Sequence, residues 1–395
     1  MAWLVAALAT SAQAQLLVAR DIAASAGLSY FGQPDGQTEG ESVVFDYDQD
    51  GDLDILLSAH GMKEWPLFQN RGDGSFVQVL AGTFPRQDRH GCVAADFGST
   101  GSSKLPDGLI DLYCVVGACQ GTCKTNYPNE LYLQTPDHRF VKVPDAWGAA
   151  DPHGRGREAA VLDFDRDGLP DIVVANEVPS IFPTPNRLYR NLGGRFQEVV
   201  DPAVTRELGS VCVEPGDIDG DGWTDLLFCS KSGVVTLKNV RGRFQDTSAS
   251  TPYRKTSAIQ LELADVDGDG RLDLLQVAQT LFTIRLNANG AFPKASFTWP
   301  LQQGRDVAVG DVDLDGVLDI YLVQGQNERY GDVMLLGNGG GKSFRTTPIP
   351  QARVGEGDVA TAVSNWNGTG RTAFLVTNGR WGEPGPVQLV TFSNR

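Results

Sequence analysis

A nine-residue acidic motif recurs along this sequence of 395 residues and restricts the folds that it can adopt. The clearest copy spans residues 265–273, with aspartates at positions 1, 3, 5 and 9 and a glycine at position 6. Four carboxylates this close repel one another unless a cation lies between them. Alternating oxygen ligands, with a glycine for the sharp turn, are the pattern that calcium selects in protein loops. The motif therefore predicts a calcium-binding loop.

The residues on either side of this loop predict β-strands. Residues 261–264 before it and 274–278 after it are short apolar runs of strand length. The two runs are separated only by the acidic loop, so they pair as a hairpin. We expect each acidic loop to join two antiparallel strands.

Four further intact copies carry aspartate at the same four positions. The predicted ligands of the five intact loops are Asp46, Asp48, Asp50, Asp54; Asp163, Asp165, Asp167, Asp171; Asp217, Asp219, Asp221, Asp225; Asp265, Asp267, Asp269, Asp273; and Asp311, Asp313, Asp315, Asp319. We expect about five bound calcium ions.

Two degenerate copies complete the set. One begins at Asp96 and Gly98, continues after eight intervening residues with Asp107 and Asp111, and is a possible metal site. The other begins at Asn365 and retains no acid.

The seven copies begin at residues 46, 96, 163, 217, 265, 311 and 365. A repeat of roughly 40–50 residues that contains four short strands is typical of a propeller blade. The sequence therefore predicts an all-β fold, a seven-bladed β-propeller that occupies residues 15–395 as one domain. Each blade would run from an inner strand through the acidic loop to three further strands.

The two ends of the sequence complement each other. The last blade ends after residues 387–392, which correspond only to a third strand, and residues 16–22 read as a strand with no blade of its own. The amino-terminal strand can therefore take the outermost place in the seventh blade. Such pairing closes the ring and covers an open strand edge.

The repeat has a counterpart in a known family. The pattern D-x-D-x-D-G-x-x-D, followed by an apolar strand and the turn Asn70-Arg-Gly-Asp-Gly-Ser-Phe76, resembles the FG-GAP/VCBS repeats of integrin-α-like propellers. Residues 151–168 look more narrowly like the cartilage acidic protein (ASPIC/UnbV-type) group. We expect no counterpart of that group's carboxy-terminal domain within these residues.

The resemblance implies a secreted recognition or adhesion module for a carbohydrate, matrix or protein ligand. Two alternatives stay open: a calcium-dependent carbohydrate-active lyase or hydrolase with its site at the channel mouth, and a structural accessory subunit of an exported complex. No nucleophile motif or phosphate loop is present in the sequence, so we expect no catalysis. Loss of activity on replacing a channel-mouth histidine, with calcium binding intact, would favour the enzyme.

The net charge and the hydropathy of the sequence limit its possible binding partners and its cellular compartment. The net charge of −16 disfavours nucleic acid, and the ligand positions of the intact loops account for twenty of the 49 acids. Residues 1–14 read as a signal peptide, with a short apolar run and a small-residue cleavage site. No apolar stretch reaches the ~18–20 residues that a membrane span needs. We expect a secreted, or in a bacterium periplasmic, monomer.

Six cysteines fit an oxidising compartment. Cys92 and Cys114 flank the second loop in the same antiparallel register in which Cys212 and Cys229 flank the fourth. Either pair can form a cross-strand disulfide, with buried free thiols as the alternative. Cys119 and Cys123 share one loop and would pair with each other.

One basic constellation predicts a second kind of site. The residue six before an acidic loop is His90, Arg157 or Arg305 in three of the blades, and His60 and His153 fall in connections on the same face. Equivalent positions in different blades meet around the mouth of the axial channel. These five residues are a candidate site for an anionic ligand, and pairing with the protein's own acids is the alternative.

Overall fold

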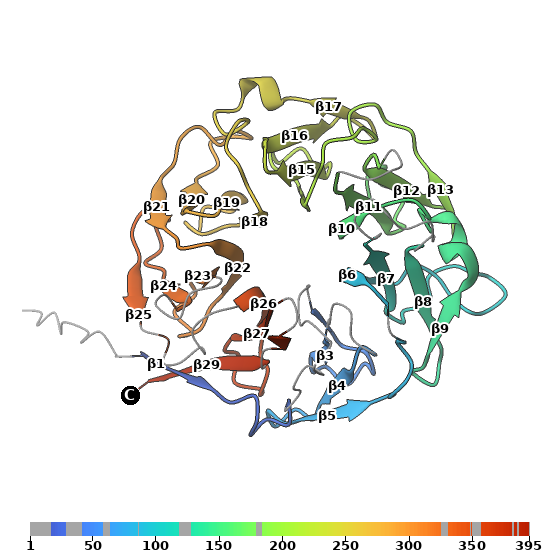
Figure 1. Ribbon diagram of the computed structural model, residues 1–395, viewed down its shortest axis with the longest axis horizontal. Helices are drawn as coiled ribbons and strands as arrows, with labels where there is room; N and C mark the ends of the chain where they lie inside the picture. The colour runs from blue at the N-terminus through green and yellow to red at the C-terminus, as the bar shows by residue number, and fades with distance from the viewer. Residues whose placement is uncertain are drawn as a thin grey trace, which may run out of the picture.

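A computed structural model shows seven antiparallel sheets arranged as the blades of a ring around a central axis (Figure 1). The structure describes residues 17–28, 42–57, 64–85, 87–117, 128–178, 184–324, 331–347, 349, 357–380, 383–384 and 387–394. The predicted all-β, seven-bladed β-propeller is confirmed. The predicted signal peptide, residues 1–14, lies outside the described residues.

Each of the first six blades contains four strands in sequential order, from the axis outward. Blades 1 to 3 comprise β2 (Val43–Phe45), β3 (Asp54–Leu56), β4 (Leu67–Asn70), β5 (Phe76–Val79); β6 (Arg89–Ala95), β7 (Asp111–Val116), β8 (Glu130–Gln134), β9 (Phe140–Val143); and β10 (Gly156–Leu162), β11 (Asp171–Asn176), β12 (Arg187–Asn191), β13 (Phe196–Glu198). Blades 4 to 6 comprise β14 (Cys212–Gly216), β15 (Asp225–Ser230), β16 (Gly233–Asn239), β17 (Phe244–Asp246); β18 (Gln260–Ala264), β19 (Asp273–Val277), β20 (Leu281–Arg285), β21 (Phe297–Pro300); and β22 (Gly304–Gly310), β23 (Asp319–Gln324), β24 (Val333–Leu336), β25 (Arg345–Thr347).

The seventh blade combines both ends of the chain. It contains β1 (Leu17–Asp21), β26 (Gly357–Val363), β27 (Ala373–Arg380), β28 (Glu383–Pro384) and β29 (Gln388–Asn394). Two short 3-10 helices, η1 (Pro144–Gly148) and η2 (Ser248–Ser250), lie in connections between blades. None of the helices in the described part is long and apolar enough to span a bilayer.

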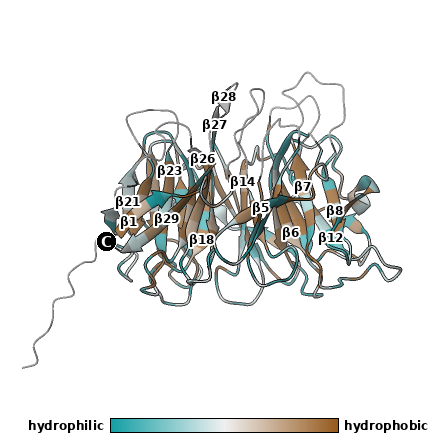
Figure 2. Ribbon diagram, turned by 90° about the horizontal axis from the view of Figure 1, so that it is seen from below, coloured by the Kyte–Doolittle hydropathy of each residue, from teal (hydrophilic) through white to brown (hydrophobic). Residues whose placement is uncertain are grey.

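The hydrophobic cores lie between neighbouring blades. Second strands such as β7 and β11 are buried along their whole length, because each is covered on both faces. Tyr113 of β7 and Ile172 of β11 belong to one such core between blades 2 and 3. The brown apolar strands and the teal polar connections at both ends are separated in the side view of Figure 2.

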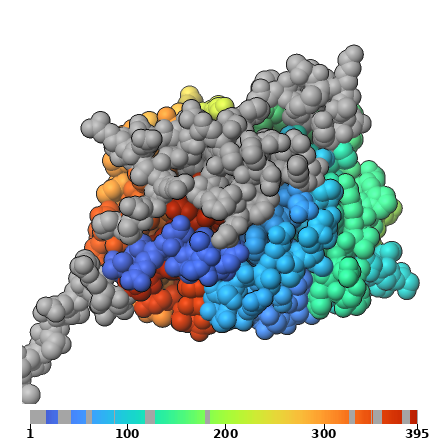
Figure 3. Space-filling view, turned by 60° about the horizontal axis from the view of Figure 1, so that its bottom comes forward, coloured from blue at the N-terminus to red at the C-terminus, as the bar shows by residue number. Residues whose placement is uncertain are grey.

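The amino-terminal strand closes the ring as predicted. β1 pairs antiparallel with β29, with Leu17 opposite Asn394 and Asp21 opposite Val390. In Figure 3 the dark blue segment lies against the red carboxy-terminal strands and reaches the lighter blue blade 1. The first and last blades therefore share strands from opposite ends of the chain.

Two disulfides join neighbouring strands inside blades 2 and 4. Cys92 lies directly opposite Cys114, and Cys212 lies directly opposite Cys229, with Cα–Cα distances of 3.9 and 5.1 Å. Both cross-strand pairs predicted from the sequence are thus formed, and no free cysteine occurs among the described residues. The predicted pair of Cys119 and Cys123 lies outside them.

Candidate metal centres

The acidic loops all join the first strand of a blade to its second strand, so they lie at one end of the propeller. The opposite end carries the connections between second and third strands, and β28, which lies between β27 and β29 in the chain, is at the top of Figure 2. We call these two ends the acidic-loop face and the connection face.

Main-chain amides fold each intact loop around its position-1 aspartate. The amide of the position-6 glycine donates to this carboxylate at 2.8–3.0 Å in all five loops. The glycine has a positive φ, from 81° to 94°, which other residues rarely adopt. The glycine therefore allows the chain to turn around the first ligand.

The position-3 aspartates carry the observation that points most directly to a cation. In each intact loop the Oδ1 atom of this residue is buried and has no hydrogen-bond partner. The five residues are Asp48, Asp165, Asp219, Asp267 and Asp313. A buried, unpaired carboxylate oxygen is energetically costly, and a bound cation would remove that cost.

The spacing of the oxygens also fits a metal ion. In each intact loop at least three carboxylates offer oxygens that all lie within 4.8 Å of one another. Two oxygens bound to one calcium ion at about 2.3–2.6 Å can lie up to about 5 Å apart. The ligand atoms are all hard carboxylate oxygens, which suit calcium, magnesium or manganese.

The position-9 aspartate has a structural role in addition to its predicted role as a ligand. It is buried in every intact loop. One oxygen accepts from the position-2 amide at 2.8–3.2 Å, and the other accepts from an amide at or just after the end of the third strand at 2.7–2.8 Å. This residue therefore ties the loop to the body of its own blade.

Burial raises the pKa of these position-9 carboxyl groups. Two amide hydrogen bonds oppose the effect of burial, and the neighbouring position-3 and position-5 carboxylates add to it. The pKa rises to about 7 in Asp54, Asp171 and Asp319, and to about 6 in Asp225 and Asp273. A bound cation would act in the opposite direction and favour the charged form.

The degenerate loop of blade 2 keeps the same turn but lacks one ligand. Asp96 accepts the amides of Asp107 and Gly108 at 3.1 and 2.5 Å, as a position-1 aspartate does in the intact loops. Position 3 falls on Gly98, which has no carboxylate. Asp96, Asp107 and Asp111 are not among the acidic clusters found in the described residues. Metal binding by this loop stays a prediction.

The loop of blade 7 has the same shape without any acid. The Asn365 side-chain oxygen accepts the Gly370 amide at 2.6 Å, which reproduces the bond between positions 1 and 6. The Asn367 side-chain oxygen accepts the Thr369 amide and hydroxyl. An amide-based turn therefore replaces the acidic loop in this blade.

Side-chain amides link the loops of blades 7, 1, 2, 3 and 4 to the next blade. The last residue of a third strand, or the asparagine just after it, donates to the position-2 carbonyl of the preceding blade. The pairs are Asn70 with Trp366, Gln134 with Tyr47, Asn191 with Phe97, Asn239 with Phe164 and Asn287 with Ile218. The sequence predicts these asparagines only as turn residues, although their recurrence before the turn glycines is visible in it.

The residues of the predicted anion site are only partly together. An Arg157 Nη1 atom lies 2.7–2.8 Å from the ring nitrogens of His90, and Arg157 Nε donates to Glu177 at 2.5 Å. Arg305 lies on β22, in blade 6, whose inner-strand neighbours are β18 and β26. His153 is exposed, and His60 lies outside the described residues.

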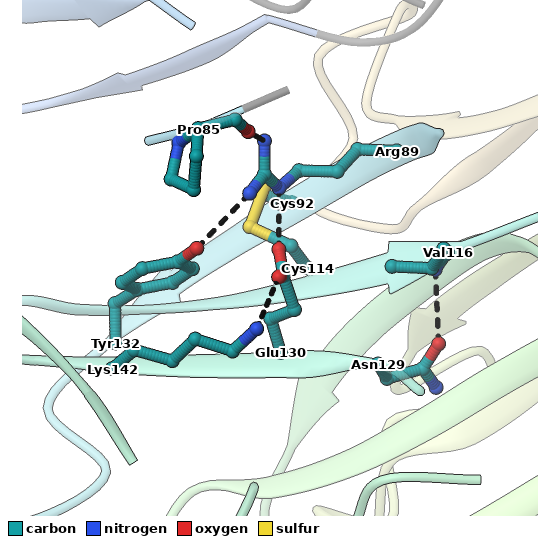
Figure 4. Close-up of a disulfide and its surroundings, with 9 residues drawn as sticks. All are labelled: Pro85, Arg89, Cys92, Cys114, Val116, Asn129, Glu130, Tyr132 and Lys142. Carbon is teal, nitrogen blue, oxygen red and sulfur yellow. Dashed lines mark hydrogen bonds and ion pairs between the residues drawn. A yellow bond between two sulfur atoms is a disulfide. The ribbon is translucent and has the colours of Figure 1, made fainter. Parts of the chain in front are cut away.

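Arg89, the neighbour of His90 in the sequence, and Trp65 are both buried. Arg89 is fully buried and donates to Glu130 at 2.6 Å, to the Pro85 carbonyl at 2.8 Å and to the Tyr132 hydroxyl at 3.0 Å (Figure 4). Trp65 is 2% exposed and lies against the Arg89 guanidinium. Packing between blades 1 and 2 covers both side chains.

The fold and its loops agree with a known repeat family. The model of the FG-GAP-like repeat matches residues 106–174, 163–228 and 217–276. FG-GAP-like repeats therefore extend from blade 2 to blade 5, within a structure that is a seven-bladed β-propeller.

Its named relatives are cartilage acidic proteins. The chain is 33% identical to human cartilage acidic protein 1 over 107 residues, which are 26% of this chain and 15% of the human protein. The mouse protein of the same name is 32% identical over 107 residues, 26% of this chain and 16% of that protein. The chain thus matches only a small part of the length of these relatives.

A solved structure supports the fold alone. An Agrocybe aegerita lectin that recognises non-reducing terminal N-acetylglucosamine aligns with a TM-score of 0.54 and 19% identity, over 86% of both chains.

Proposed function

We propose that this chain is an exported, calcium-stabilised propeller that recognises a carbohydrate or protein ligand. The buried, unpartnered position-3 oxygen in each of the five intact loops supports the calcium part of this proposal most directly. Asp at positions 1, 3, 5 and 9 would hold each ion, which would neutralise the repulsion between them.

The calcium ions would act on stability. Extracellular calcium modules often have dissociation constants of about 10⁻⁴–10⁻³ M. At roughly 1 mM free calcium each site would then add ~0.4–1.4 kcal/mol to the free energy of unfolding. Five such sites amount to ~2–7 kcal/mol, which is comparable to the whole stability of many domains.

Two observations support export. The disulfides within blades 2 and 4 are of the kind that persists in oxidising compartments. The named relatives are cartilage acidic proteins, and cartilage is an extracellular tissue. Their names state no catalytic activity, so recognition is the role that we assign.

We assign recognition to the connection face between blades 3 and 4. A cavity of about 310 Å³ lies there, with Glu177 and Lys231 among its charged lining residues and Leu208 among its apolar ones. The Glu177 carboxylate also accepts a hydrogen bond from Arg157, so the cavity adjoins the cluster that contains His90. A mixture of charged and apolar groups in one hollow suits a polar ligand such as a sugar.

A binding screen tests this role. The calcium-loaded full chain would be applied to a glycan array and to immobilised extracellular proteins, together with the variant Lys231→Glu. We expect a bound ligand whose signal falls at least tenfold in this variant. Lys294→Glu makes the same charge change at an exposed site in the connection between the third and fourth strands of blade 5, and should leave binding intact.

Two outcomes would contradict the proposed role. Equal binding by the Lys231→Glu and Lys294→Glu variants would exclude the cavity on the connection face as the ligand-binding site. Turnover of a bound glycan into cleaved products, lost on replacing His90, would favour a carbohydrate-active enzyme.

A further inference from the structure

The five intact acidic loops differ in the side chain that contacts their carboxylates from the third strand. In blades 1, 3 and 4 the residue just before the inter-blade asparagine points at the position-3 aspartate. These residues are Gln69 in β4, Arg190 in β12 and Lys238 in β16. The same place along the chain is Leu286 in blade 5 and Leu336 in blade 6.

In blades 3 and 4 this residue brings a fixed positive charge to two predicted ligands at once. Arg190 contacts Oδ2 of Asp165 at 2.6 Å and Oδ2 of Asp167 at 2.9 Å. Lys238 contacts Oδ2 of Asp219, and its nitrogen lies 3.4 Å from Oδ2 of Asp221. Both basic side chains are only partly exposed.

In blade 1 the equivalent contact carries no charge. The Gln69 amide donates to Oδ2 of Asp48 at 2.5 Å. This loop also has an additional acid, Asp52, at position 7. In blade 6 no ion pair to the loop occurs among the described residues, but the positive charge of Arg345 on β25 acts electrostatically on the position-3 Asp313. In blade 5, Arg271 contacts the position-5 aspartate.

The basic side chains do not occupy the Oδ1 atoms of the position-3 aspartates, which would bind the ion. All contacts described above involve the Oδ2 atoms, and the Oδ1 atoms of Asp48, Asp165 and Asp219 stay buried and unpartnered. A divalent ion in blade 3 or 4 would therefore share its carboxylates with a tethered cation. Ligand charge is one of the properties that set calcium affinity.

We infer that the calcium sites form two classes, in which blade 1 binds the ion tightly and blades 3 and 4 bind it more weakly because Arg190 and Lys238 partly neutralise their ligands. The inference rests on the calcium binding proposed above. A unit charge a few ångströms from a divalent ion, in a partly screened site, changes affinity by roughly tenfold. Blades 3 and 4, which carry the cavity on the connection face, would load after blade 1 as calcium rises.

Hydrogen exchange during a calcium titration assigns the affinities to individual blades. The full chain would be stripped with chelator and titrated with calcium chloride, and amide protection would be followed by mass spectrometry. We expect peptides that cover residues 46–54 to become protected at roughly tenfold lower calcium than peptides that cover residues 217–225.

Substitutions with glutamine reproduce the blade 1 contact in the weaker blades. Lys238→Gln should lower the calcium midpoint of residues 217–225 roughly tenfold, and Arg190→Gln should do the same for residues 163–171. The reciprocal change Gln69→Lys should raise the midpoint of residues 46–54. Lys255→Gln removes an exposed positive charge on the connection side of blade 4 and should change none of the midpoints.

The outcomes separate the two proposals. Equal midpoints in blades 1 and 4, or a midpoint that rises in Lys238→Gln, would overturn the division into classes and make Lys238 a positioning residue for Asp219. The absence of calcium-dependent protection in every acidic loop would instead overturn the calcium binding itself. The Gln69→Lys variant keeps the inference testable if a glutamine variant does not fold.

Discussion

The side-chain amide of Asn239 donates a hydrogen bond of 2.8 Å to the main-chain carbonyl of Phe164, a residue 75 positions earlier in the preceding blade. The main-chain amide of the same asparagine donates to Asp225 at 2.7 Å. Asn239 therefore connects the acidic loop of its own blade to the acidic loop before it. Similar bonds make neighbouring loops parts of one network around much of the ring.

Replacing Asn239 by alanine should destabilise the propeller. The substitution leaves the Phe164 carbonyl without its side-chain donor in a buried place, which costs about 1–3 kcal/mol. Urea denaturation with calcium present measures the change in the free energy of unfolding. Asn338→Ala is the matched control, because Asn338 is exposed and bonds only locally to Ser343. Equal stability of the two variants would mean that the inter-blade bond contributes nothing.

Replacing one position-3 aspartate should remove a single ion. Asp267→Asn replaces a charged oxygen ligand of blade 5 with a neutral amide, so the number of tightly bound calcium ions should fall by one. Calorimetric titration of the stripped protein gives that number. Asp137→Asn alters an aspartate in an exposed turn and should preserve it. A loss of all ions from Asp267→Asn would indicate that the sites do not load separately.

The stabilising effect of calcium should grow with pH. In the metal-free protein the position-9 carboxyl groups have pKa values raised by burial to about 6 or 7, above the usual 3.8. The folded metal-free state thus binds more protons than the unfolded state between these values, and its stability falls as pH rises from about 4 to 7. Calcium requires the charged form, so bound calcium offsets this loss.

Thermal unfolding at several pH values measures this effect. The difference in Tm between calcium and chelator should be small at pH 5 and large at pH 8. A difference that is constant, or that shrinks as pH rises, would contradict the assignment of the position-9 groups.

Replacing Arg89 should lower the free energy of unfolding, because Arg89 is buried between blades 1 and 2. Arg89→Leu deletes a fully buried cation and leaves the Glu130 carboxylate, which is 2% exposed, with Lys142 as its remaining ion-pair partner. Breaking a buried pair in this way costs about 3–5 kcal/mol. Arg139→Leu breaks the exposed pair with Asp137 and should cost less than about 1 kcal/mol. Chemical denaturation gives the free energy of unfolding of both variants. Similar decreases in the two would contradict the larger contribution assigned to the buried Arg89 pair.

The repeats allow the fold of this chain to be predicted from its sequence, whereas the contacts between blades cannot be predicted in this way. Asp265 and its equivalents mark the first hairpin of six blades, and the strand at Leu17–Asp21 matches the missing place beside β29. The Asn239 bond to Phe164 depends on how two blades are placed against each other, which a repeat pattern does not contain.

The candidate ligand site was harder to predict for the same reason. Arg89 and His90 are adjacent in the sequence, yet Arg89 is enclosed between blades and His90 lies beside Arg157. Alternation along a strand separates them, and only the packed structure shows which side is covered.

Calcium content is the most direct measurement of whether the acidic loops are metal centres. The purified chain would be brought to equilibrium by dialysis against roughly 10 mM calcium, about tenfold above the weakest expected dissociation constant, and elemental analysis would give the calcium that it holds in excess of the outside solution. About five calcium ions per chain are expected, one for each loop with an unpartnered position-3 oxygen. A folded chain that retains no calcium, or any other divalent ion, under these conditions would contradict that assignment.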